Sequence, residues 1–146
     1  MATPANASLG FAAFAAMQAL GRLAGDRIIM RIGRMATVLA SSLLCTAALA
    51  ILAAGVGQIP AFICYGVLGL ATANIIPIFF WAAGNQKLMP VENALSCAST
   101  CGYAGLLAGP AAIGFAAHAF SLPAAYGIVA ALTFLVACAS VKFRER

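Results

Sequence analysis

Charged residues gather in three short clusters, and the chain between these clusters is long and apolar. The clusters cover residues 22–34, 87–92 and 142–146, whereas residues 35–86 and 93–141 include no Asp, Glu, Lys or Arg. A helix needs about 20 apolar residues to cross a hydrocarbon core of about 30 Å, so an uncharged interval of about 50 residues fits two crossings and a tight turn. Each interval therefore predicts a membrane-spanning helical hairpin.

Turn-forming residues divide the chain into five predicted spans. Glycines and Pro60 interrupt the first hairpin, and a loop at 84–90 separates the two hairpins. The first apolar run is short, and we expect its helix to continue into the charged cluster. A four-span alternative with an interfacial first helix is disfavoured because this run has no polar face. The prediction is an all-α integral membrane protein, a bundle of five transmembrane helices in a single domain (1–146), with spans at about 8–24, 35–56, 59–83, 95–117 and 124–141.

The basic residues predict the orientation in the membrane. All eight Lys and Arg residues lie in the three clusters, which the hairpins place on one side. The positive-inside rule assigns that side to the cytoplasm. We therefore expect a multi-pass protein of the inner or plasma membrane, with the N-terminus outside and the C-terminus cytoplasmic. The first charge, Arg22, follows the first apolar run, so this run does not resemble a signal peptide and is expected to stay in the mature chain.

Composition excludes several classes of function. Apolar residues make up 64% of the chain and charged residues only 8%, against about a quarter in soluble proteins. Because the basic residues flank apolar spans, the net charge of +5 indicates topology rather than nucleic-acid binding. The spans hold no acidic residue, so we expect no catalytic residues, no enzyme activity, no cofactor and no metal. The cysteines lack zinc or redox spacing and are expected to be small buried hydrophobes: Cys45, Cys64, Cys97, Cys101 and Cys138.

The first charged cluster combines glycines with acidic and basic residues, as Gly25-Asp26-Arg27 followed by Arg31-Ile32-Gly33-Arg34. This pattern resembles the cytoplasmic loop signature of the major facilitator superfamily (MFS) of transporters. Met30 stands where an acidic residue is common in the family, and Asp26 lies one helical turn earlier. A carboxylate and several guanidiniums at a helix end can pair with one another and cap helix carbonyls across a mobile interface. The alternative is that the arginines only set the topology. The motif residues are Gly25, Asp26, Arg27, Arg31, Gly33 and Arg34.

Two later stretches are also similar to this family. Residues 73–77 (Ala-Asn-Ile-Ile-Pro) resemble the tenth helix of sugar-permease-like members, and residues 102–114 resemble the glycine-rich eleventh helix. The resemblance implies the last five of twelve helices, that is, an incomplete C-terminal half. It also implies a substrate cavity at Asn74, Pro77 and Trp81. A helix interface is expected at Gly102, Gly105, Gly109, Pro110 and Gly114.

The residues leave alternatives open for these sites and for the function. Asn74 could make a packing hydrogen bond instead of a substrate contact, and Trp81 could be an interfacial aromatic residue. The leading hypothesis is transport of an unknown small solute by alternating access, as part of an MFS-type transporter that is truncated and inactive alone. The expected partners are lipid, that solute, and a missing N-terminal half or a second copy. The alternative is a small membrane protein that binds or scaffolds a partner.

Overall fold

The chain is an all-α protein in this computed structural model, which describes the backbone of residues 4–144 and the side chains of residues 8–141. Its helices are α1 (Pro4–Ile32), α2 (Arg34–Ala53), α3 (Gln58–Thr72), α4 (Ile75–Gly84), α5 (Val91–Ala119) and α6 (Leu122–Arg144).

Four stretches are long and apolar enough to cross a membrane, which confirms the predicted all-α membrane fold. They are Arg34–Ala53, Gln58–Gly84, Val91–Ala119 and Leu122–Val141. Helix α1 is not among these four, although it has 29 residues. Its assignment as a fifth span stays a prediction. The helix does continue through the charged cluster, as expected, and ends only at Ile32.

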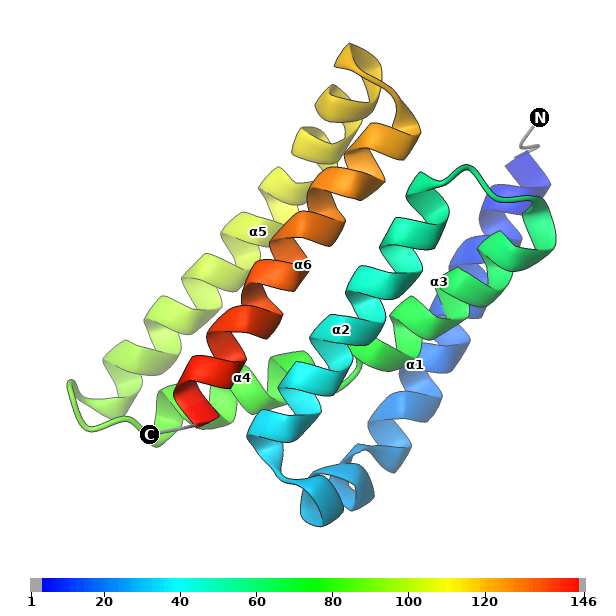
Figure 1. Cartoon of the computed structure of the whole chain (residues 1–146). Helices are drawn as coiled ribbons and strands as arrows, with labels where there is room; N and C mark the ends of the chain where they lie inside the picture. Colours follow the sequence, from blue (N-terminus) through cyan, green and yellow to red (C-terminus); the bar gives the residue numbers. More distant parts are fainter. Residues whose placement is uncertain (1–3, 145–146) are drawn as a thin grey trace.

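The helices form two groups that meet at α2. Helices α5 and α6 run side by side, α6 packs against α2, and α1 packs mainly against α3 (Figure 1). Helix α4 leaves the α1–α3 pair and reaches the beginning of α5. Ala48, Leu52 and Cys64 form a small buried core between α2 and α3. The chain therefore folds as a thin, elongated bundle rather than around one thick core.

The third predicted span, 59–83, is a broken helix. Helix α3 ends at Thr72, Ala73 and Asn74 interrupt the helical structure, and α4 begins at Ile75. Pro77 explains the position of this break, because it lacks the amide hydrogen that would bond the Ala73 carbonyl in a continuous helix. Proline is tolerated in the first turn of a new helix, which is where Pro77 lies. The interruption is a turn of only two residues, because Ala73 and Asn74 both keep right-handed helical dihedrals, with φ of −53° and −104°.

The first charged cluster is helical except for one residue. Gly33 alone separates α1 from α2, and its φ of 84° favours glycine over any residue with a side chain. The Gly33 carbonyl accepts hydrogen bonds from the backbone amide and the hydroxyl of Thr37, at 3.0 and 2.8 Å. A sharp reversal of direction is thereby fixed at a single residue.

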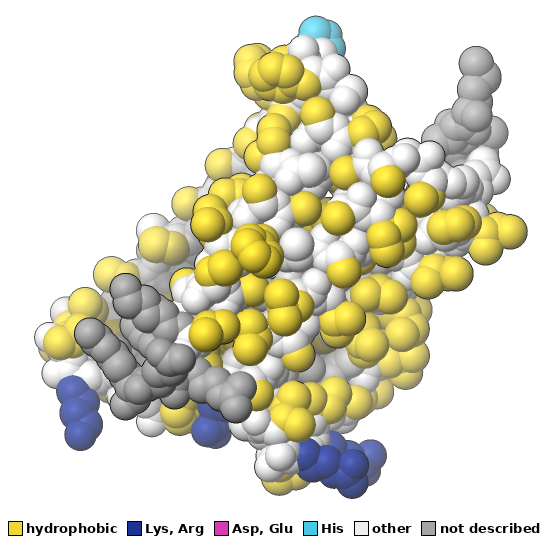
Figure 2. All heavy atoms as spheres, in the orientation of Figure 1, with side chains coloured by type: hydrophobic (Ala, Val, Ile, Leu, Met, Phe, Trp, Pro, Cys, Tyr) yellow, Lys and Arg dark blue, Asp and Glu magenta, His cyan; other side chains and the backbone are white. Residues whose placement is uncertain are grey.

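Basic side chains gather at one end of the bundle, which we call the basic end. It holds the α1–α2 junction at Gly33 and the α4–α5 turn at 85–90 (Figures 1 and 2). The histidine side chain lies at the opposite end (Figure 2). The third cluster, 142–146, lies outside the described side chains.

The surface between the two ends is strongly apolar. Leu23 and Leu107 are each 80% exposed, and Phe115 is 76% exposed. Exposed apolar side chains on this scale fit a lipid environment rather than water. The expectation that all five cysteines are buried is wrong for Cys97, Cys101 and Cys138, which are exposed. In lipid an exposed position does not disfavour a small apolar thiol, so burial could not be inferred from residue type.

Candidate functional site

Helices α1 and α3 approach each other closely where glycines lie between them. A Cβ added to Gly21 would lie 2.7 Å from the Cβ of Ala73. A Cβ on Gly69 would run into the backbone carbonyl of Phe14. Small residues permit such close backbone approach in membrane bundles, where no hydrophobic effect drives helices together. This interface fixes the position of the helix break against α1.

Asn74 lies at the break and bonds across this interface. The residue is 7% exposed, and its side-chain Nδ2 donates a hydrogen bond to the Gly21 carbonyl of α1 at 3.1 Å. The Asn74 amide also fills the space where a Cβ of Gly25 would lie. Two sets of predicted residues, the loop motif and the substrate cavity, are therefore in direct contact here. In this chain the amide has the helix-packing role that was weighed as the alternative to a substrate contact.

Other polar contacts join the helices at points that the sequence analysis missed. Gln18 lies 3.5 Å from the Thr72 hydroxyl and joins α1 to α3. The hydroxyls of Tyr65 and Tyr126 are 2.8 Å apart and join α3 to α6. A third contact links Thr46 of α2 to Thr133 of α6, at 2.9 Å between their hydroxyl oxygens. Each of these residues is a polar group inside an apolar run, and that signal could have marked them, since such groups seek partners in lipid.

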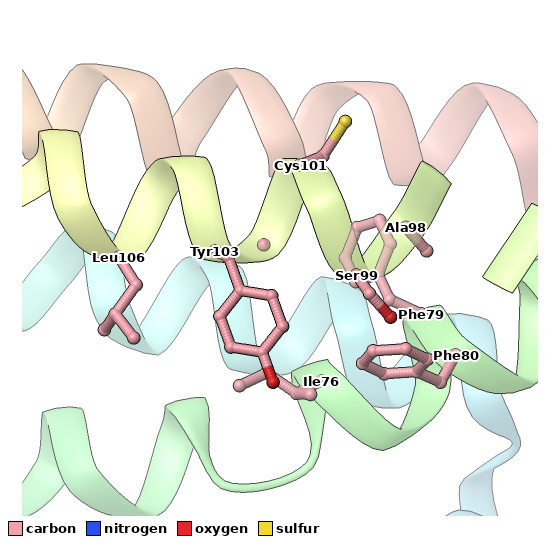
Figure 3. Close-up of a pocket in the computed structure, with 9 residues that line it drawn as sticks. Ile76, Phe79, Phe80, Ala98, Ser99, Cys101, Tyr103 and Leu106 are labelled. Atoms are coloured by element: carbon pink, nitrogen blue, oxygen red, sulfur yellow. The ribbon is translucent and has the colours of Figure 1, made fainter. Parts of the chain in front are cut away.

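An apolar pocket of about 630 Å³ lies between α4 and α5. The side chain of Tyr103 on α5 points toward Ile76 at the start of α4, Leu106 points to the same side of α5, and Ser99 lies near Phe79 (Figure 3). The lining includes no charged residue, and its hydroxyl groups are those of Ser99 and Tyr103, whereas the thiol of Cys101 points away from α4 (Figure 3). The full lining is Ile76, Phe79, Phe80, Ala98, Ser99, Cys101, Gly102, Tyr103 and Leu106.

The three predicted cavity residues do not share one site. Asn74 is buried against α1, and Pro77 is exposed in the first turn of α4. Trp81 is 46% exposed, and the guanidinium carbon of Arg34 lies 3.8 Å from the centroid of its ring. Trp81 thus contacts the loop motif, and none of the three is among the residues that line the α4–α5 pocket.

The charged residues of the loop motif project from the basic end. Asp26, Arg27 and Arg31 are exposed on the last turns of α1. Among the side chains that the structure describes, Asp26 forms no ion pair with an arginine. The predicted pairing within the cluster is therefore absent between these residues, and the arginine contact present is the one between Arg34 and Trp81.

The predicted interface on the fourth span faces open space in this chain. A Cβ added to any of its four glycines would meet nothing within 4 Å. Pro110 lies inside α5 without ending the helix. These residues therefore form no close contact with the other described helices, and an interface here requires a partner outside residues 4–144. The glycines are Gly102, Gly105, Gly109 and Gly114.

Comparison with known proteins finds relatives that are named as transporters or membrane proteins. The chain is 45% identical over 139 residues to an uncharacterized MFS-type transporter of Yersinia pestis, in a match that covers 94% of this chain and 36% of that protein. The chain thus matches a portion of an MFS transporter. The predicted family resemblance is confirmed. No family model matches the chain, and no solved structure matches it.

Two further relatives agree on the extent of this MFS portion. Membrane protein MosC of Rhizobium meliloti is 36% identical over 139 residues, covering 93% of this chain and 33% of that protein. An uncharacterized transporter of Sinorhizobium fredii is 27% identical over 134 residues, covering 90% of this chain and 35% of that protein. The chain spans about a third of the length of the curated relatives it matches. It is a multi-pass membrane protein related to transporters.

Proposed function

We propose that this chain is the C-terminal part, helices eight to twelve, of a transporter that moves a small solute by alternating access. The observation that carries the proposal is the 45% identity, over nearly the whole chain, to an MFS-type transporter. The order of the three resembling stretches supports the placement near the C-terminus. The proposed orientation puts the basic end in the cytoplasm, in accordance with the positive-inside rule.

The broken helix supports a transport role on physical grounds. Non-helical backbone at membrane depth is tolerated where it is packed in protein or lines a cavity, and transporter sites commonly use discontinuous helices. Here the break at Asn74 adjoins α4, and three α4 residues line the apolar pocket. Asn74, Pro77 and Trp81 remain the proposed cavity residues of the complete transporter. An amide held by one packing bond has remaining donor and acceptor capacity for a solute.

The proposal requires a second part that completes the rocking cycle. Alternating access moves two halves around a site near the midplane, so residues 1–146 alone should not transport. The DNA upstream of this chain gives the first test, because an open frame of about seven further spans is expected there. A ribosome-binding site directly before Met1 would instead favour a small protein in its own right.

A transport assay tests the function itself. The gene, with its upstream frame, is deleted, and metabolites are compared in cells and medium between the deletion strain and the complemented strain. A solute whose distribution changes is then tested for uptake into proteoliposomes containing the full-length protein. We expect uptake by the full-length protein and none by residues 1–146 alone. A full-length protein that is folded yet leaves every solute unchanged contradicts the proposal.

The open glycine face of α5 favours a second candidate function, a small membrane protein that binds a partner. Four glycines of α5 meet nothing within 4 Å, so a second helix can approach this face closely. Replacing Gly105 with Cys tests this candidate, because an oxidant should crosslink the chain to a second copy or to another membrane protein. Crosslinking to a separate protein, with no upstream transporter frame, would support the partner-binding function over transport.

A further inference from the structure

Helix α4 is held in place by few contacts. It begins after the break at Asn74 and ends at Gly84, before the turn that leads to α5. Within Ile75–Gly84, all of which the structure describes, Ile78 is the buried residue. Elements with few buried contacts open at low free energy. The position of α4 therefore depends on a small number of contacts, and one of them lies at the basic end.

The contact at the basic end joins α4 to the first residue of α2. Arg34 follows Gly33 directly, so the sharp reversal there fixes the point from which its side chain extends. Its guanidinium carbon stands 3.8 Å from the Trp81 ring centroid, which is within the range of a favourable cation–π contact. The Asn85 side-chain amide donates a hydrogen bond to the Trp81 carbonyl at 2.8 Å and closes this end of the helix.

We propose that Arg34 is a positioning residue, which holds α4 against the start of α2 through Trp81 and so sets the width of the α4–α5 pocket. Phe79 and Phe80 precede Trp81 in the same short helix and line the pocket. A ten-residue helix moves as a unit, so displacement of Trp81 displaces both phenylalanines. The loop motif thus acts on the pocket through one aromatic ring.

Holding α4 in place differs from the two simpler roles of this pair, which are setting the topology for Arg34 and marking the membrane interface for Trp81. An arginine that only sets topology acts through its charge, and any other basic residue at this end should substitute for it. A tryptophan that only marks the membrane interface needs no cation beside it. A cation–π contact depends on both partners together, so the two substitutions should fail to add.

Trp81 reports on the contact directly, because it is the only tryptophan in the chain. In the full chain in lipid nanodiscs, Arg34→Gln should raise the quenching of Trp81 fluorescence by acrylamide. Arg34→Lys, which keeps a cation, should have a smaller effect. The matched control is Arg22→Gln, which removes an exposed arginine of the same cluster that is not in contact with Trp81. Equal quenching in Arg34→Gln and Arg22→Gln would overturn the proposal.

The width of the pocket is measured by thiol labelling of a cysteine at Ser99. The Ser99→Cys substitution is introduced after the five native cysteines are replaced, and a lipid-permeant maleimide is applied. Loss of a cation–π contact should raise the labelling rate by about two- to fivefold in Arg34→Gln or Trp81→Leu, and Trp81→Phe should fall between these and the parent.

The double variant Arg34→Gln with Trp81→Leu should label no faster than either single variant. Circular dichroism and monodispersity in detergent show whether each variant is folded. Additive effects in the double variant, or unchanged labelling in all folded variants, would overturn the proposal. If Trp81→Leu does not fold, the labelling rates of Arg34→Gln and Trp81→Phe are compared with that of the parent. Faster labelling in both variants supports the proposal, and unchanged labelling in both overturns it.

Discussion

At the scale of single residues, the side chain of Asn74 explains why position 25 is a glycine, because it lies directly against that residue. The Asn74 amide occupies the place where a Cβ would be, and it is held there by its bond to the Gly21 carbonyl. A larger residue at position 25 forces the amide to turn away and lose that bond. A glycine that the family resemblance attributes to a signature loop thus also has a packing reason inside this chain.

The first prediction concerns this pair. Gly25→Ala should lower the free energy of unfolding by about 1–2 kcal/mol, because the displaced Asn74 amide gives up an interhelical hydrogen bond. In an Asn74→Ala background the same Gly25→Ala change should cost almost nothing, since the obstructing amide is gone. Unfolding titrations in mixed micelles measure both values. An equal cost in the two backgrounds would show that something other than Asn74 requires a glycine at this position.

At the scale of elements, the glycines of α3 and α5 are in opposite situations. Gly69 faces the backbone carbonyl of Phe14, which cannot rotate away as a side chain can. Gly105 faces open space. A repeated small-residue pattern is therefore not enough to say where two helices of this chain touch.

The second prediction compares these glycines. Gly69→Ala should lower the free energy of unfolding by about 1–3 kcal/mol, because α1 and α3 must separate. The same substitution at Gly105, which lies inside α5 and faces open space, should not lower it and should raise it by up to about 0.5–1 kcal/mol, because alanine is the better helix former. Thermal unfolding in detergent, followed by circular dichroism, measures both.

The third prediction follows from the proposed function. In the full-length transporter, Gly105→Leu should abolish transport while membrane abundance is kept, because the glycine face is expected to meet the other half. Normal transport by this variant would show that α5 faces lipid at Gly105. Gly114→Leu tests whether the requirement extends along the whole face.

The helices show which structural features could be predicted from the sequence and which could not. The position of the 84–90 loop was predictable because Pro90 and the charged residues interrupt the apolar pattern there, although α5 begins at Val91, before the span expected from 95. The break at Asn74 was not, because hydropathy is unchanged across it and Pro77 is compatible with a bent or a broken helix. The partner of Asn74 was also unpredictable, since Gly21 lies 53 residues away in sequence. The exposed thiols were misjudged because a lipid-facing surface and a buried core select the same residue types.

At the scale of the whole molecule, the distribution of charge is the feature that predicts orientation. The basic end contains the α1–α2 junction and the α4–α5 turn, whereas the α2–α3 turn lies at the other end (Figures 1 and 2). The family and the membrane fold were predictable from this pattern together with the signature residues. The interface expected on the glycine face of α5 stays a prediction, because the glycines of that face meet no other described helix within 4 Å.

The fourth prediction tests the orientation by labelling intact cells. After replacement of the native cysteines, Gln58→Cys should react with an impermeant maleimide, and Leu88→Cys should react only after permeabilisation. Leu88 is chosen for the cysteine because it is 93% exposed in the α4–α5 turn. The neighbouring Gln86 is less suitable, because its side chain forms hydrogen bonds with the backbone of that turn and a cysteine there would remove them. The reverse labelling pattern would place the basic end outside the cell.

The pairing of α1 with α3, rather than with the adjacent α2, has a consequence for synthesis at the ribosome. The Asn74–Gly21 bond joins residues 53 positions apart. At about 5–20 residues per second, α3 follows α1 by roughly 3–10 seconds. Throughout that delay the face of α1 that carries Gly21 and Gly25 is uncovered, and α1 is not among the four candidate spans of the described residues. We therefore expect this face of α1 to be covered during synthesis, by the translocation machinery or by helices that precede α1 in a complete transporter, until α3 emerges.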